Sequence, residues 1–458
     1  MVASAGTLDR TGIIVRGLAL LLLCANAFLA FQSGWPTFFS GLSTLLWLPL
    51  MSGLFWVALR KGKPIAAAVV FVFSLAYSPG LGSALSVGTS INVGVGASQG
   101  SVLTALLLLT TFLAIVVVAS CIVPVTRAPS EESEAPTYIA TLALTAVAGL
   151  GALRDGSWSY YLSERGEAVL GDIRVSALYL PALFSSFVLM ARRTVRSGSL
   201  ISYGLLSAVG IALWLVQNRR LLIGACVVSL LVVMLSRPKL GRMLRFSAFV
   251  GVFAVVGFSA STAARSARLI DGPTSDVSLA GDLGSPSLLS KQISTRALYL
   301  ATDAVTVETS EVHRIEPYLL DAFYVCLARA TPGILFPHKY DLQDKTCELI
   351  YYSSDRQFLD LSCTPITEGY ASDQWLGVLL VALVFGLAAA FGDWLIGRGR
   401  AITLVGGAAL ATQLVMIESE AFPIFQALRS CFSVMVPAFV LSTILGKLLP
   451  RRLLLLLD

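Results

Sequence analysis

Charged residues are scarce in this chain. Asp, Glu, Lys and Arg make up 13% of its 458 residues, whereas about 25% is typical of soluble domains. Only two histidines are present, His313 and His338, and neither belongs to an HExxH-type metal motif. A glycine-rich phosphate-binding loop followed by Lys and Ser or Thr is also missing. The sequence therefore argues against an ATP-driven pump and a zinc hydrolase, and it predicts no metal and no other cofactor.

Hydrophobic residues dominate what is present, at 56% of the chain. Many of the apolar runs approach the roughly 20 residues that cross a bilayer as a helix. The first run follows Arg10 and Arg16 without a small-residue cleavage site, so we interpret it as a retained span. The sequence predicts an all-α, polytopic membrane bundle of about 12 transmembrane helices. They lie near 12–31, 37–58, 64–79, 101–123, 137–153, 175–191, 199–216, 221–236, 246–262, 374–395, 401–417 and 429–449.

Basic residues predict the orientation. With the N-terminus in the cytoplasm, every inside loop carries Lys or Arg, as the positive-inside rule requires. The net charge of +6 therefore reports topology and gives no reason to expect nucleic acid as a partner. Both termini are then cytoplasmic, provided that the chain reverses near 217–220. The loops concerned are Arg60–Lys63, the stretch around Arg127, Arg192–Arg196, Arg237–Arg242, Arg398–Arg400 and Arg451–Arg452.

Two consecutive arginines, Arg219 and Arg220, interrupt the apolar run from Leu200 to Ser236 and fall at the outer end of this predicted hairpin. An arginine at membrane depth costs roughly 2.5 to 3.5 kcal/mol, so the pair is a functional-site hypothesis by default. We interpret it as a clamp for an anion. Alternatively, both side chains snorkel to outer headgroups or pair with acids.

The predicted spans divide the chain into three parts. Nine spans fill residues 1–262, an outer loop domain with helical patterns covers 263–373, and three spans fill 374–458. The outer domain faces an oxidising compartment in this topology, which favours a disulfide between Cys347 and Cys363. Cys326 makes the number of cysteines there odd, so the pairing stays open.

Two stretches near the end of the outer domain carry a resemblance. Ala330–Lys339 is a proline-flanked apolar turn ending in lysine, and Thr364–Gly377 contains Thr-Pro-x-x-Glu-Gly-Tyr and runs into the tenth span. Together with the many spans and the outer arginine pair, they resemble the Wzy-type polysaccharide repeat-unit polymerases. These are bacterial inner-membrane glycosyltransferases related to the O-antigen ligases. The resemblance covers the overall layout and about a third of the chain in motif terms.

The resemblance implies a reaction at the periplasmic face. The donor is a growing glycan on undecaprenyl pyrophosphate, and it is transferred with inversion onto a new lipid-linked repeat unit, building O-antigen, capsule or exopolysaccharide. The leaving lipid pyrophosphate supplies the energy, so no metal or nucleotide sugar is needed. The expected partners are the lipid-linked oligosaccharide, the lipid bilayer and a polysaccharide chain-length regulator.

Candidate residues can be matched to the steps of this reaction. Arg219 and Arg220 would bind the departing pyrophosphate, because planar guanidinium groups hold phosphate in a bidentate manner. Glu368 is the first choice for the base that takes the acceptor proton, with His313 and His338 as alternatives; the related ligases use a histidine in their outer loop, and no counterpart is placed here. Alternatively, Glu368 only complements a helix dipole.

The remaining candidates would bind the second substrate. Lys339 and Arg314 would contact the acceptor pyrophosphate; alternatively each is a solvated surface charge, which is the more usual role of such residues. Aromatic residues could stack on sugar rings or could serve as interfacial anchors; they are Tyr351, Tyr352, Tyr370 and Trp375.

Three function classes stay open at this point. An O-antigen ligase or another lipid-linked-sugar glycosyltransferase would differ from the polymerase mainly in its acceptor. A lipid-linked glycan flippase or transporter would also suit twelve spans, although nine spans before the loop and three after it show no internal repeat. The third class is a structural partner in an envelope complex.

Overall fold

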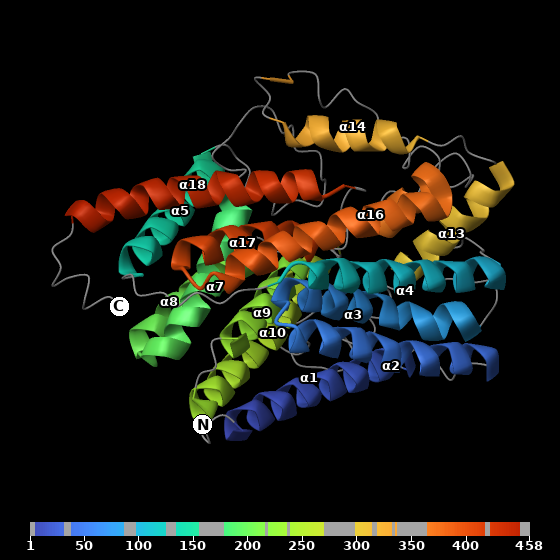
Figure 1. The fold of residues 1–458 in the computed structure, drawn as a ribbon, viewed down its shortest axis with the longest axis horizontal. Helices are drawn as coiled ribbons and strands as arrows, with labels where there is room; N and C mark the ends of the chain where they lie inside the picture. Colours follow the sequence, from blue (N-terminus) through green and yellow to red (C-terminus); the bar gives the residue numbers. More distant parts are fainter. Residues whose placement is uncertain are drawn as a thin grey trace.

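The computed structural model describes residues 5–31, 38–86, 98–124, 134–154, 178–215, 219–235, 239–269, 298–313, 318–331, 335–336, 364–416 and 422–448. Regular structure in these ranges is entirely helical (Figure 1). The helices are α1 (Ala5–Phe31), α2 (Phe38–Arg60), α3 (Pro64–Ser86), α4 (Gln99–Ile122), α5 (Ala135–Arg154), α7 (Tyr179–Ser197), α8 (Leu200–Leu215), α9 (Arg219–Leu235), α10 (Leu240–Leu269), α13 (Leu298–His313), α14 (Leu319–Ala330), α16 (Pro365–Gly397), α17 (Ala401–Leu414) and α18 (Ile424–Leu448).

Each of the predicted spans coincides with one of these helices, so the all-α prediction is confirmed. Six helices are long and apolar enough to cross a membrane, namely α3, α4, α5, α10, α16 and α18. They indicate a multi-pass membrane protein. Helices α1, α2, α8, α9 and α17 contain shorter apolar stretches.

Helix α7 differs from these helices because it carries three arginines near its end. It is nevertheless buried along almost its whole length and forms part of the centre of the bundle.

Several basic loops meet at one end of the bundle. The guanidinium of Arg192 donates to the Glu134 carboxylate and, at 2.7 Å, to the carbonyl of Gly399, and Arg196 pairs with Glu134 at 2.9 Å. Arg242 donates to the carbonyl of Arg196. The starts of α5 and α10, the end of α7 and the turn between α16 and α17 therefore lie together. We call this the basic end.

The turn between α2 and α3 belongs to the same end. The ammonium of Lys63 donates to the carbonyl of Val123, just past the end of α4. Asp393, near the end of α16, accepts a hydrogen bond of 2.7 Å from the amide of Ile65 in the first turn of α3. Burial lowers the pKa of Lys63, while the nearby Asp393 carboxyl acts in the opposite direction. The ends of α2, α4 and α16 thus lie at one level.

Residues 216–218, at the predicted reversal, lie outside the described ranges, but packing supports the reversal because α8 and α10 begin at the same end, where Arg242 donates to the carbonyl of Arg196. Gly210 of α8 packs against Phe253 of α10, whereas Leu222, in the first turn of α9, packs against Gly257 further along α10. Helix α8 therefore runs away from the basic end, and α9 starts at the opposite end. A single helix from 199 to 236 is excluded.

The opposite end, which we call the far end, is where α3 finishes and where α4 and α16 begin. Below it, Phe73, Phe112 and Phe385 form an aromatic cluster with ring centroids 5.3 to 6.2 Å apart that joins α3, α4 and α16. Helix α13, which falls in the predicted outer domain, packs directly on these three helices. Figure 1 shows α13 and the start of α16 at the right, whereas α1 begins and α18 ends towards the left.

Candidate functional site

The first part of α16 is a separate short helix. Thr364 caps it: its hydroxyl accepts from the amide of Thr367 at 3.1 Å, and the amide of Thr364 donates in return to the Thr367 hydroxyl. Proline follows at the first helical position, where a missing amide proton costs nothing. The helix then breaks at Asp373 and Gln374, whose backbone angles are not helical. Gln374 has φ of 46°, and it is the only residue other than glycine with positive φ in the described ranges.

Two glycines allow the chain to fold back at this break. Residues eight apart in a continuous α-helix are separated by about 12 Å. A Cβ placed on Gly377 would instead lie 1.9 Å from the carbonyl oxygen of Gly369. The short helix 365–372 is therefore folded tightly against the start of the long segment that follows, as the sharp turn of α16 in Figure 1 shows. The amide of Tyr318, just before α14, closes the turn by donating to the carbonyl of Ser372 at 2.8 Å.

The start of this short helix points at a buried carboxylate. Asp303 of α13 is 2% exposed and accepts hydrogen bonds from Tyr77 at 2.7 Å, from Thr364 at 3.1 Å and from Thr367. Tyr299 packs its ring against Tyr77, with centroids 5.7 Å apart. Since a helix N-terminus carries a partial positive charge, the position of Asp303 complements the dipole of the short helix. Three elements, α3, α13 and α16, are joined by this one side chain.

Burial also changes the acidity of Asp303. Removal from water raises the pKa of its carboxyl from 3.8 to about 6, and the three hydroxyl donors act in the opposite direction. The burial effect dominates because no positively charged side chain is among the groups that shift it. Asp303 can therefore exchange a proton near neutral pH.

Glu368 lies in the first turn of the short helix and is 5% exposed. Its amide continues the helix by donating to the carbonyl of Thr364 at 3.0 Å. Tyr370, two residues further on, is buried, whereas Trp375 is 39% exposed just after the break. Of the two sugar-contact candidates that the structure describes, Tyr370 and Trp375, the second therefore has the more accessible ring. The roles proposed for all three residues stay predictions.

The other predicted residues are only partly within the described ranges. Arg219 and Arg220 form the first turn of α9, and His313 is the last residue of α13; the backbone of these three is described but not their side chains. Helix α9 begins at the far end, the same end as the broken helix. The residues outside the described ranges are Arg314, His338, Lys339, Cys347, Tyr351, Tyr352 and Cys363.

Sequence reasoning missed Asp303 and Tyr77. Asp303 is a lone acid between Leu298 and Val307, and Tyr77 is a lone hydroxyl-bearing ring in the apolar part of α3. A polar side chain in an apolar segment needs a partner, which is a usable signal. The signal does not identify the partner, because Tyr77 and Asp303 are 226 residues apart in the chain.

Comparisons with known proteins identify no family for this chain. No protein-family model matches the chain, and neither the curated proteins nor the solved structures include a significant match to it. Among the described residues, no three His, Cys, Asp or Glu side chains come together as a metal-binding group. What the structure does offer at the far end is two buried carboxyl groups on and beside a broken helix.

Proposed function

We propose that the protein is a membrane glycosyltransferase that polymerises undecaprenyl-pyrophosphate-linked oligosaccharide repeat units. The observation that carries the proposal is Glu368, a buried carboxyl group on the short helix 365–372, at the far end of the bundle. A buried carboxyl group beside a break in a membrane helix is a functional-site hypothesis, because an acid at membrane depth is otherwise unfavourable.

Charge distribution supports placing this site on the periplasmic side. The basic end gathers the loops that contain Arg192, Arg242 and Lys63. Under the positive-inside rule, that end faces the cytoplasm. The far end, where α9 and α16 begin, then faces the compartment in which lipid-linked glycans are polymerised. Twelve transmembrane helices and cytoplasmic termini belong to the same proposal.

The reaction has two needs that these residues could meet. The acceptor hydroxyl oxygen forms a bond to the anomeric carbon of the donor while its proton passes to Glu368. The bond from that carbon to the phosphate oxygen breaks, and the electron pair leaves on the lipid pyrophosphate. Arg219 and Arg220 at the start of α9 would stabilise the charge that develops there. His313 and His338 remain the alternative bases.

Asp303 acts as a positioning residue in this scheme. Through Thr364 and Thr367 it fixes the first turn of the short helix, which is the turn that carries Glu368. Loss of the hydrogen bond from either threonine hydroxyl to Asp303 would let that turn rotate or fray. The orientation of Glu368 therefore depends on a contact between α13 and α16.

The test is polymer formation in membranes that contain the wild type, Glu368→Gln, Arg219→Lys or Arg220→Lys, with protein amounts matched and products resolved as a ladder. The proposal expects single lipid-linked units to accumulate in all three variants. Arg400→Lys at the basic end is the matched control and should give a normal ladder. Normal ladders from Glu368→Gln would remove it as the base and move His313 and His338 forward.

One observation favours a second candidate, a lipid-linked glycan flippase. Broken helices whose half-helix N-terminus lies within the membrane are typical of secondary transporters. The same membranes separate the two functions. A wild type that moves lipid-linked units across the bilayer but forms no ladder is a flippase, and the polymerase proposal is then wrong. A ladder that grows only on lipid A core would instead indicate an O-antigen ligase.

A further inference from the structure

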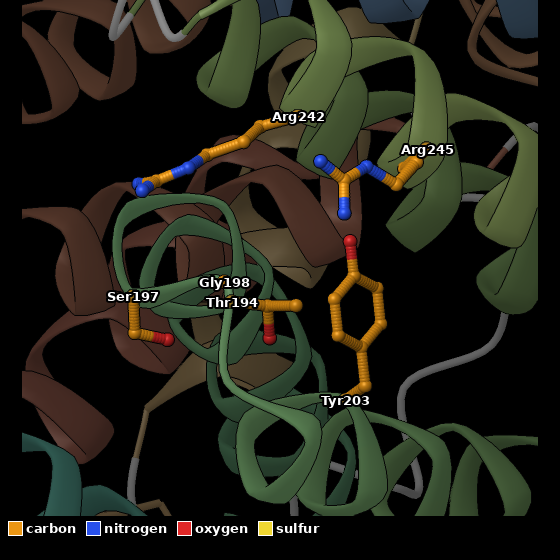
Figure 2. Close-up of a pocket in the computed structure, with 6 residues that line it drawn as sticks. All are labelled: Thr194, Ser197, Gly198, Tyr203, Arg242 and Arg245. Atoms are coloured by element: carbon orange, nitrogen blue, oxygen red, sulfur yellow. The ribbon is translucent and has the colours of Figure 1, made fainter.

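A cavity at the basic end lies between α8 and the start of α10. It has a volume of about 200 Å³ and is lined by Thr194, Ser197, Gly198, Tyr203, Arg242 and Arg245. Figure 2 shows the two arginines on one side of the cavity, facing the turn that joins α7 and α8. The hydroxyl of Tyr203 points towards the guanidinium of Arg245 in the same view.

The turn between α7 and α8 has a defined conformation. Gly198 caps α7 with φ of 66°, and its amide donates to the carbonyl of Thr194 at 2.8 Å. Glycine adopts this left-handed conformation at little cost. Arg242 reaches over the turn and donates to the carbonyl of Arg196, so its guanidinium is held in place at the rim of the cavity. One wall of the cavity is thus preorganised.

The Arg245 guanidinium makes one hydrogen bond to the described part of the chain. Its Nε donates to the carbonyl of Gly241 in its own helix at 3.3 Å. In the described part of the chain, neither its terminal nitrogens nor the Tyr203 hydroxyl hydrogen-bonds to another residue. The ring of Tyr203 is held by an edge-to-face contact with Phe249, with centroids 5.4 Å apart. A ligand could therefore accept from Arg245 and Tyr203 together.

The cavity has a net positive lining, although the C-terminus of α7, whose Arg196 carbonyl accepts from Arg242, offsets part of that charge. No acid lines it, and both α8 and α10 begin beside it, so two helix N-termini add to the charge of two arginines. Basic residues in the first turns of a helix oppose the helix dipole, and two neighbouring guanidinium groups repel each other. A bound anion would relieve both effects.

The surroundings of the cavity are apolar. Leu200 is 87% exposed at the start of α8, and Leu240 and Leu244 are 54% and 61% exposed in the first turns of α10. Only 17% of the apolar span of α10 is buried inside the bundle. These surfaces suit acyl chains next to a headgroup, and basic pockets between helices on the cytoplasmic side bind anionic headgroups in other membrane proteins.

We propose that this cavity binds a phosphate group through Arg242, Arg245 and Tyr203, as the headgroup of an anionic phospholipid or as a free phosphate. The planar guanidinium groups match the geometry of phosphate oxygens. The proposal does not depend on the glycosyltransferase function, since it concerns the other end of the molecule.

Binding to the purified full-length chain tests the proposal. Native mass spectrometry in a neutral detergent would follow the first lipid bound from palmitoyl-oleoyl phosphatidylglycerol and from the matching phosphatidylcholine. Calorimetry with inorganic phosphate forms the second arm. Arg245→Ala is the main variant, because the only described hydrogen bond of this side chain is to its own helix. Arg400→Ala is the control, an exposed arginine of the same end that lies outside the cavity.

A phospholipid site predicts that the wild type and Arg400→Ala bind phosphatidylglycerol at least tenfold more tightly than phosphatidylcholine and that Arg245→Ala loses this preference. Arg245→Lys should keep part of it, since lysine retains the charge but not the planar fork. Phosphate binding that needs Arg245, without lipid preference, would support a soluble phosphate as the source. The proposal is overturned if Arg245→Ala and Arg400→Ala affect both probes equally.

Discussion

The buried carboxyl group of Asp303 should make stability depend on pH in a defined direction. Its pKa rises from 3.8 to about 6 on folding, which corresponds to about 3 kcal/mol between the two protonation states. Because the folded pKa is the higher one, the folded protein favours the protonated acid. The stabilisation is therefore fully present below pH 3.8 and is lost as the pH rises through 6.

The substitution Asp303→Asn isolates this effect. Asparagine is neutral at every pH, and its carbonyl can still accept from Thr364 and Thr367. Relative to this variant, the wild type should lose about 2.4 kcal/mol of unfolding free energy between pH 4 and pH 8, because a small part of the loss already falls below pH 4. Other titrating groups contribute equally to both proteins and cancel in the difference.

The measurement is equilibrium unfolding in mixed detergent micelles at several pH values. Asp321→Asn, which makes the same substitution at an exposed acid of α14, is the control. A difference between wild type and Asp303→Asn that stays flat across this range would refute the reasoning, since it would mean that the folded carboxyl group titrates at its ordinary pKa.

Substitutions at three further residues, Gly377, Glu134 and Asp393, test the packing described above, each by thermal midpoint and by yield of monodisperse protein. Gly377→Ala should destabilise by at least about 3 kcal/mol, because its Cβ meets the facing backbone oxygen at 1.9 Å; Gly53→Ala, with nothing within 4 Å, should be neutral or stabilising. Glu134→Ala leaves Arg192 buried without its acid and should cost about 3 to 5 kcal/mol. Asp393→Ala should cost about 1 to 3 kcal/mol through the lost bond to α3, and Asp393→Asn less. Equal effects within the Gly377 and Gly53 pair or within the Asp393 pair would contradict these assignments, and so would a Glu134→Ala variant as stable as the wild type.

The helices could be predicted from the sequence because each is a property of a local apolar run. The break near residues 217–220 was predictable for a different reason, since a continuous helix would have moved every later basic loop to the other side of the membrane. The positions of the basic loops thus distinguished two helices from one long helix, which hydropathy alone could not do. The structure bears this out by bringing Arg192, Gly399 and Arg242 to one end.

The position of α13 could not be predicted in the same way. Its pattern indicates a helix, and the length of the loop around it suggested a separate outer domain. Whether such a helix covers the bundle or packs into it depends on its partners. Buried Asp303 and the hydrogen bond from the Ser98 amide, at the start of α4, to Glu308 hold α13 against the bundle. Neither contact has a local sequence signature.

The fold-back of α16 is the feature on which the candidate site depends, and its cause is distributed over three places in the chain. Thr364 and Pro365 start a helix, and Gly369 and Gly377 let two backbone segments touch, but these residues alone are equally compatible with one straight helix. Asp303 favours the folded-back arrangement over a straight helix. It lies buried on α13, so its hydrogen bond from Thr364 and its favourable interaction with the helix dipole form only when the N-terminus of the short helix points into the bundle. The orientation of the first turn, and with it that of Glu368, is therefore set by a residue more than 60 positions earlier in the chain.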